Sequence, residues 1–143
     1  MIEGVKQESS KRVSTFDAKG KENGFLTEMF KDGGKTTVYL SSTAAGGFKG
    51  YHLHRVRAAR YICLKGKMKI ILWKPGTKER EEYILDASTP SRLYIPPRIA
   101  TGLQNIGNEE AWLVNFPDPA YNPDLKDEQV EYTQKELEAG IVK

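Results

Sequence analysis

Short segments rich in apolar and β-branched residues, separated by turn residues, extend along most of the chain. They predict strands at residues 25–30, 36–40, 48–54, 60–64, 68–73, 82–85, 91–95, 101–106 and 111–116. Turn-forming residues lie between them, for example at residues 44–47 and 75–76. Many short strands at this spacing indicate a β-sandwich or a closed β-barrel, and not a series of alternating strands and helices.

The pattern changes after residue 117. Residues 118–131 are polar and contain Pro119 and Pro123, which predicts an irregular arm over the barrel. One short helix is predicted near the C-terminal end, where Thr133 can cap residues 134–139 before Gly140. We therefore expect one domain, residues 1–143, with an N-terminal segment 1–24 and a C-terminal arm 117–143.

Composition and charge narrow the functional class. The net charge of +3 in 143 residues is small and scattered, so nucleic acid is not expected as a partner, although a weak positive field favours a small phosphorylated ligand. No apolar run approaches the roughly 18 residues of a membrane helix, and the opening residues lack a signal-peptide pattern. We expect a cytoplasmic protein without a membrane partner. The only cysteine, Cys63, lies in an apolar strand and is interpreted as a core thiol.

The only two histidines of the chain are His52 and His54. Because side chains alternate along a strand, residues two apart lie on the same face. Two exposed surface histidines are the simpler interpretation, but a shared site is favoured when both histidines of a protein lie on one strand face.

The same region resembles the first motif of the cupins, a glycine-rich strand with His-x-His followed by Glu and Gly. His52, His54 and Gly66 match it, and Ala59 stands at the Glu position. The resemblance implies an all-β fold, the double-stranded β-helix or jelly-roll barrel of the cupins, with the short C-terminal helix added.

Residues 96–105 resemble the second cupin motif, Pro-x-Gly-x-x-His-x-x-x-Asn. Pro96 and Asn105 match, but Thr101 stands at the position of the metal-binding histidine. With Ala59, this removes two of the four positions at which metal-binding cupins carry ligands. Because zinc or iron needs three or four good ligands, we predict no metal and no cofactor.

From about residue 23 to about residue 136, the chain resembles the nucleotide-sugar branch of the cupins. This branch comprises the dTDP-4-dehydrorhamnose 3,5-epimerases and their shorter relatives. Residues 23–28 resemble the Arg-Gly-x-Phe-x-Glu opening of the family, and residues 49–52 resemble Arg-Gly-Leu-His. Residues 93–97 match Leu-Tyr-Ile-Pro-Pro, and residues 133–136 resemble Ser-x-Lys-Asp. The order of these motifs along the chain carries the resemblance.

The resemblance implies an isomerase that epimerises a 4-keto-6-deoxy nucleotide sugar at C3, C5 or both. The expected partner is a nucleotide-diphosphate sugar, in a homodimer that exchanges its N-terminal segments. His52 matches the catalytic base of the family, and Glu136 is expected to orient its ring. Substrate-binding roles are expected for Glu28, Lys49, His54, Arg60 and Thr101.

The family's acid, a tyrosine on the strand that contains residues 112–115, is absent here. Tyr61, Tyr94 and Tyr121 are the candidates to replace it. Two other functions stay open. The Gly-x-His-x-His strand also fits a sugar-nucleotide 3,4-ketoisomerase, and the missing tyrosine favours a cupin that binds sugars or nucleotides without catalysis.

Overall fold

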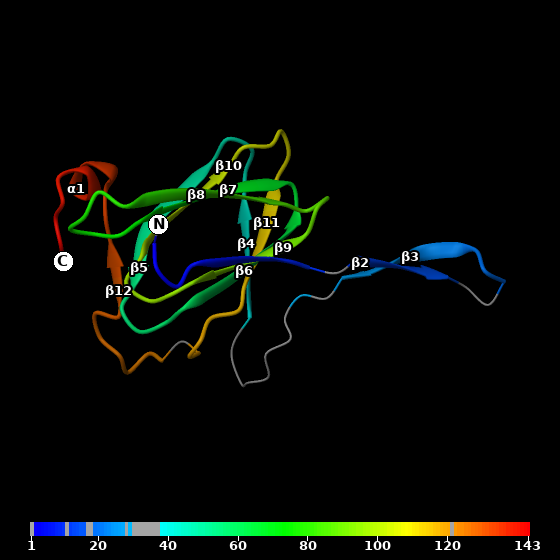
Figure 1. Ribbon diagram of the computed structural model, residues 1–143, viewed down its shortest axis with the longest axis horizontal. Helices are drawn as coiled ribbons and strands as arrows, with labels where there is room; N and C mark the ends of the chain where they lie inside the picture. The colour runs from blue at the N-terminus through cyan, green and yellow to red at the C-terminus, as the bar shows by residue number, and fades with distance from the viewer. Residues whose placement is uncertain (1, 11, 17–18, 28, 30–37, 121) are drawn as a thin grey trace.

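Two five-stranded antiparallel sheets face each other and form a barrel in the computed structural model, which describes residues 2–10, 12–16, 19–27, 29, 38–120 and 122–143 (Figure 1). The first sheet has the order β1 (Lys6–Ser9), β9 (Ser91–Ile95), β6 (Ala59–Lys65), β11 (Ala111–Asn115) and β4 (Tyr39–Thr43). The second has the order β12 (Gln129–Glu131), β5 (Phe48–His54), β10 (Ala100–Asn105), β7 (Lys67–Trp73) and β8 (Arg80–Asp86).

A hairpin of β2 (Arg12–Phe16) and β3 (Glu22–Thr27) extends away from the barrel (Figure 1). Its two strands pair with each other and not with either large sheet. The preceding strand β1, in contrast, pairs with β9 of its own chain. Exchange of segment 1–24 between two chains therefore stays a prediction.

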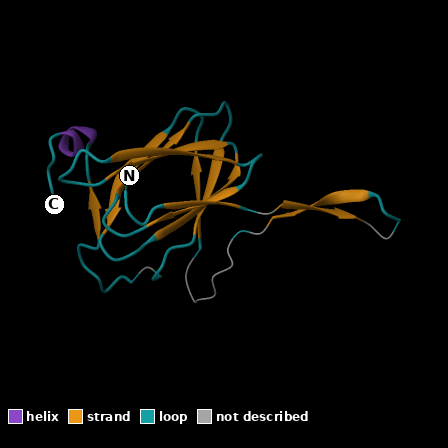
Figure 2. Ribbon diagram, viewed as in Figure 1, coloured by secondary structure: helices purple, strands orange, loops and turns teal. Residues whose placement is uncertain are grey.

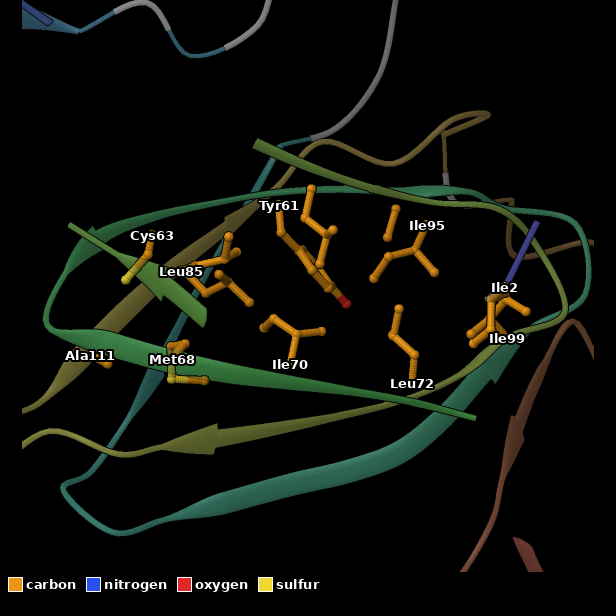
Figure 3. Close-up of a cluster of buried hydrophobic side chains, with 13 residues drawn as sticks. Ile2, Tyr61, Cys63, Met68, Ile70, Leu72, Leu85, Ile95, Ile99 and Ala111 are labelled. Atoms are coloured by element: carbon orange, nitrogen blue, oxygen red, sulfur yellow. The ribbon is translucent and has the colours of Figure 1, made fainter. Parts of the chain in front are cut away.

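The core lies between the sheets and comes from the alternate residues of their strands (Figure 3). On β7, Met68, Ile70 and Leu72 are fully buried and point into the barrel. Ile71 points to the other side of the same sheet, where it packs in a second apolar cluster with Leu137. This burial on both faces explains why β7 is apolar almost throughout. Each such side chain contributes roughly 1.5–3 kcal/mol by leaving water.

The helix α1 (Gln134–Glu138) covers that second cluster, and it is the one helix in the described part of the chain (Figure 2). The Thr133 side chain accepts a hydrogen bond from the backbone N–H of Glu136, and Gly140 follows with a φ of +72°. The predicted helix and its cap are confirmed. No helix among the described residues has the length and apolar character needed to cross a membrane.

The predicted strands from residue 48 onward all form, with bounds within two residues of the predicted ones. Cys63 is a buried free thiol, as predicted. The prediction of an irregular arm is wrong for residues 129–131, which form β12 beside β5. A three-residue edge strand with one apolar residue, Val130, is too short to produce a readable alternation. Part of the predicted strand 36–40, and the turn before it, lie outside the described residues.

Candidate active site

A cavity of about 170 Å³ lies inside the barrel and is bounded by both sheets. Its lining combines polar and apolar side chains: His52, His54, Arg57, Ala59, Tyr61, Ile95, Pro96, Ile99, Thr101, Leu103 and Gln129. A cavity of this volume has room for several waters. It can therefore hold a small polar ring, with anything larger extending out of it.

Strand β5 brings both histidines to this cavity because they lie two residues apart, as predicted. In the sheet, His52 lies opposite Thr101 of β10, and His54 lies opposite Gln129 of β12. The close approach of β5 to β10 depends on Gly50, which has a φ of +124°. A Cβ atom at Gly50 would lie 2.7 Å from the carbonyl oxygen of Thr101, closer than real side chains allow. A glycine is therefore required here to place the histidine strand.

His54 is held by a buried ion pair. A guanidinium nitrogen of Arg57 lies 2.9 Å from Nδ1 of His54, and Arg57 Nε lies 2.5 Å from Glu128 Oε1. The side chains of Arg57 and Glu128 are only 10% and 7% exposed. Burial alone would raise the pKa of Glu128, but hydrogen bonds from Arg57 and from the Val56 backbone outweigh it and lower that pKa. Glu128 is therefore a carboxylate at neutral pH.

The surroundings of His54 disfavour its charged form. Burial lowers the pKa of His54, and the nearby Arg57 cation lowers it further. The Glu128 carboxylate, 3.4 Å from Nδ1, opposes these effects only in part. His54 is therefore a neutral imidazole at pH 7.

His52 is in a looser and more open setting. Its side chain is 40% exposed, against 25% for His54. Its Nδ1 atom lies 3.7 Å from Glu131 Oε1 and 3.4 Å from the side-chain amide of Gln129. The nearest charged partner is thus an acidic group, which stabilises a positive imidazolium. The two histidines share a cavity but differ in the charge beside them.

Tyr61 enters the same cavity from the opposite sheet. It lies on β6, next to Ala59 in the inward-facing set of that strand, and its hydroxyl group points into the barrel (Figure 3). Among the described residues, this hydroxyl has no hydrogen-bond partner. Burial raises the pKa of Tyr61 to about 12, so the phenol keeps its proton at neutral pH. Of the three candidate acids, Tyr94 is 36% exposed and absent from the cavity lining, and Tyr121 lies outside the described residues.

Among the predicted substrate-binding residues, Thr101 and His54 line the cavity, whereas the two predicted cations do not. Arg60 points away from Ala59 and Tyr61, stacks on the Phe116 ring at 4.5 Å and donates to the Phe116 carbonyl oxygen. Strand alternation explains this placement, because position 60 lies between two inward-facing residues. Arg60 therefore lies outside the cavity lining, and its expected role in substrate binding stays a prediction.

Lys49 donates from Nζ to Ser41 Oγ at 2.9 Å and to the Ser42 carbonyl oxygen at 2.6 Å. It is exposed and lies outside the cavity lining. Glu28, the remaining predicted binding residue, lies outside the described residues.

Glu136 makes no contact with His52 in the described structure. Its carboxylate forms an ion pair with Lys143, because α1 packs on the outer face of the second sheet while the histidines face the inside. The acidic groups near the histidines are instead Glu128 and Glu131, just before and at the end of β12. The carboxylate beside His52 is thus that of Glu131, and not that of Glu136 as expected.

Sequence reasoning missed Arg57, Glu128 and Glu131. Arg57 follows His54 by three residues, and this short spacing was the one feature of the local sequence that could have indicated a contact between them. Among the described residues, no three His, Cys, Asp or Glu side chains are grouped so that they could hold a metal ion.

A family model described as the polysaccharide biosynthesis C-terminal domain matches residues 19–129. No curated protein gives a significant sequence match.

Several solved structures resemble the chain. A dTDP sugar isomerase from Desulfovibrio desulfuricans aligns with a TM-score of 0.76 at 17% identity, over 93% of this chain and 86% of its own. A 3'-monoepimerase from Streptomyces bikiniensis, in complex with dTDP-quinovose, gives 0.75 at 18% identity, over 98% and 75%. A sugar 3,4-ketoisomerase from Thermoanaerobacterium thermosaccharolyticum, in complex with TDP, gives 0.69 at 19% identity, over 98% and 96%. At these identities the likeness concerns the fold, and it confirms the predicted cupin barrel.

Proposed function

The chain belongs to the polysaccharide biosynthesis C-terminal domain family, and on that premise we propose that it is a nucleotide-sugar isomerase. Its substrate is a nucleotide-diphosphate sugar with a keto group at C4, and it moves a proton on a carbon next to that group. Epimerisation of a 4-keto-6-deoxy sugar at C3, C5 or both is the reaction that we favour. The likeness to a dTDP sugar isomerase and to a 3'-monoepimerase supports this choice.

One observation carries the proposal: a titratable histidine and a protonated tyrosine face one cavity from opposite sheets. Inverting a carbon requires a base on one face of the sugar ring and an acid on the other. His52 on β5 and Tyr61 on β6 supply that pair.

The protons balance as follows. His52 removes the proton from the carbon next to the keto group, and the electron pair of the C–H bond moves to form an enolate. Tyr61 gives its proton to the same carbon from the other face, and the enolate returns to a ketone with the opposite configuration. The imidazolium of His52 and the phenolate of Tyr61 then recover their starting states by exchange with water.

The decisive experiment is incubation of the protein with a panel of nucleotide 4-keto sugars in deuterated water, followed by NMR and mass analysis. Deuterium at C3 or C5 with inverted configuration is the expected result. A product with its carbonyl at C3 would instead identify a 3,4-ketoisomerase. Nucleotide-sugar binding without any exchange would identify a binding protein and contradict the proposed reaction.

The 3,4-ketoisomerase is the second candidate, and two observations favour it. The ketoisomerase from Thermoanaerobacterium thermosaccharolyticum matches this chain over 96% of its own length, whereas the monoepimerase is matched over 75%. His54, which occupies the second position of Gly-x-His-x-His, is also the better anchored of the two histidines.

We also propose that the protein acts as a homodimer, since the β2–β3 hairpin pairs with neither sheet of its own barrel. The exposed Lys49 is our candidate for contact with the diphosphate, outside the cavity. The single buried cysteine, Cys63, is compatible with the reducing cytoplasm that we expect for this protein.

A further inference from the structure

We propose that Arg57 fixes His54 as a neutral imidazole whose Nε2–H group donates a hydrogen bond to the keto oxygen of the substrate. His54 would then stabilise the enolate and leave proton removal to His52. This inference rests on the proposed function, because it assigns a role in that reaction to residues of the same cavity.

The first argument concerns the position of the proton on the His54 ring. A guanidinium group can donate hydrogen bonds but cannot accept them. The 2.9 Å contact from Arg57 therefore requires a lone pair on Nδ1 of His54. A neutral ring that accepts at Nδ1 carries its proton on Nε2. Nε2 has no hydrogen-bond partner among the described residues, so it is left for a ligand in the cavity.

Glu128 could compete for the same nitrogen, because its Oε1 atom lies 3.4 Å from Nδ1. The distances decide against it. That oxygen already accepts from Arg57 Nε at 2.5 Å, and Arg57 is closer to Nδ1 than Glu128 is. Glu128 thus holds Arg57 in place, and Arg57 in turn sets the ring of His54.

The second argument concerns charge. The ionisable groups that face His54 are Arg57 and Glu128, with His52 beside it on β5 and Tyr61 across the cavity. Adding a second proton to the ring, at Nδ1, would place a positive charge against the Arg57 cation in a partly buried position. The carboxylate of Glu128 is already paired with Arg57 and offsets this repulsion only in part. These groups favour the neutral form of His54.

A neutral donor suits the chemistry of enolate formation. Negative charge develops on the keto oxygen as the proton leaves the carbon, and a prepositioned N–H group stabilises it without having to reorganise. A neutral imidazole can perform this role without releasing its own proton to the enolate. Lysine would be a poor replacement for Arg57, because one ammonium nitrogen cannot reproduce the two-nitrogen grip on Nδ1 and Glu128.

The tautomer can be measured directly by ¹⁵N NMR of protein labelled at histidine, since the chain has only two histidines. In the His52→Asn variant, the remaining histidine ¹⁵N signals come from His54. We expect His54 to carry its proton on Nε2 and to have a pKa below that of an ordinary histidine. In Arg57→Met, Glu128 should accept from Nδ1–H instead, and the pKa of His54 should rise. Arg55→Met is the matched control, because Arg55 donates to the Asp127 carbonyl oxygen and not to a histidine.

Catalysis gives the second measurement. Arg57→Met should lower kcat for deuterium exchange about 10²–10³-fold, the usual loss of one oxyanion donor, while the affinity for a nucleoside diphosphate stays near that of the wild type. Arg57→Lys keeps the charge and should lose about as much activity, which covers the case in which Arg57→Met does not fold.

The outcomes separate this inference from the proposed function. An active wild-type protein whose His54 carries the proton on Nδ1, or is charged at pH 7, contradicts the inference. A protein with the expected tautomer that exchanges no deuterium with any 4-keto sugar contradicts the proposed function and leaves the assigned tautomer standing.

Discussion

At the scale of single residues, the two histidines separate by what lies next to each ring. His52 has a carboxylate at 3.7 Å and is 40% exposed. His54 has a guanidinium at 2.9 Å and a lowered pKa. A base must accept a proton and hold the resulting charge, and only the surroundings of His52 favour that charge.

Replacing His52 by asparagine should therefore remove deuterium exchange at the sugar carbon. Loss of a general base typically costs about 10²–10⁴-fold in rate. Nucleotide affinity should change little, because in the proposed reaction His52 acts on the sugar carbon and not on the nucleotide. His54→Asn should weaken sugar binding and slow the reaction. Exchange that persists in His52→Asn and vanishes in His54→Asn would reverse the roles and favour the ketoisomerase.

The carboxylate partner of His52 can be identified with two conservative variants. Glu131→Gln removes the charge near Nδ1 of His52 and should lower the exchange rate. Glu136→Gln changes a residue that pairs with Lys143 and should leave the rate near that of the wild type. If Glu136→Gln is the damaging change instead, the pairing expected from the sequence is restored.

Tyr61→Phe should separate proton exchange from inversion. Without the phenol, His52 can still remove a proton and return a deuteron to the same face of the carbon. We therefore expect deuterium incorporation with retained configuration, and a loss of inverted product of about 10²–10⁴-fold. The melting temperature should hardly change, because the hydroxyl has no hydrogen-bond partner among the described residues. Tyr94→Phe on the exposed side of β9 is the control, and wild-type inversion in Tyr61→Phe would exclude Tyr61 as the acid.

At the scale of the elements, strand β5 depends on Gly50. Gly50→Ala forces a Cβ against the Thr101 carbonyl oxygen at 2.7 Å and strains a φ of +124°. We expect a loss of about 2–3 kcal/mol in the free energy of unfolding, measured by urea denaturation. Gly46→Ala is the matched control, since Gly46 also has a positive φ but a Cβ atom added there would meet open space. Equal losses in both variants would show that the contact with β10 is unimportant.

Alternation made the barrel strands from residue 48 onward predictable, because one or both of their faces are buried. It failed for β1, whose four residues are all exposed, and for β12, which has a single apolar residue. Strands of this kind form because a neighbouring strand offers unpaired backbone N–H and C=O groups. Their local sequence does not indicate which strand that will be, so they cannot be predicted from it.

The same reasoning explains how much of the site could be predicted. His52 and His54 were found because a spacing of two residues is local information. The partners of His54 were not, because Arg57 meets Glu128 across 71 positions of sequence and Glu128 lies in a segment without periodicity. Glu136 was assigned to His52 from its motif. However, α1 packs on the outer face of the second sheet, whereas His52 points to the inner face.

At the scale of the whole molecule, the β2–β3 hairpin indicates assembly. Among the described strands, the hairpin pairs with neither large sheet. An isolated two-stranded hairpin is marginally stable in water, and Val13 on β2 is 42% exposed. We expect light scattering to give twice the chain mass of 16.1 kDa at micromolar concentration. A mass near 16 kDa would contradict the dimer. Val13→Asp should weaken the assembly, because it would bury a charge in the contact.

We also expect no tightly bound transition metal. Elemental analysis of tag-free protein should show far less than one metal per chain, and chelation should leave deuterium exchange unchanged. The physical reason is the ligand set, since Ala59 and Thr101 stand beside the two histidines in the cavity and offer no strong donor. About one zinc, iron or nickel per chain would overturn this prediction.

The edge position of β12 has a consequence for ligand binding. Among the described strands, β12 pairs with β5 alone, and backbone hydrogen bonds between Tyr51 and Tyr132 continue that pairing. The segment is anchored at both ends, by the buried Arg57–Glu128 ion pair on one side and by the buried Tyr132 on the other. Detachment would carry away Gln129 and both acidic neighbours of the histidines. The affinity of a ligand that contacts these side chains therefore depends on β12 being attached to β5.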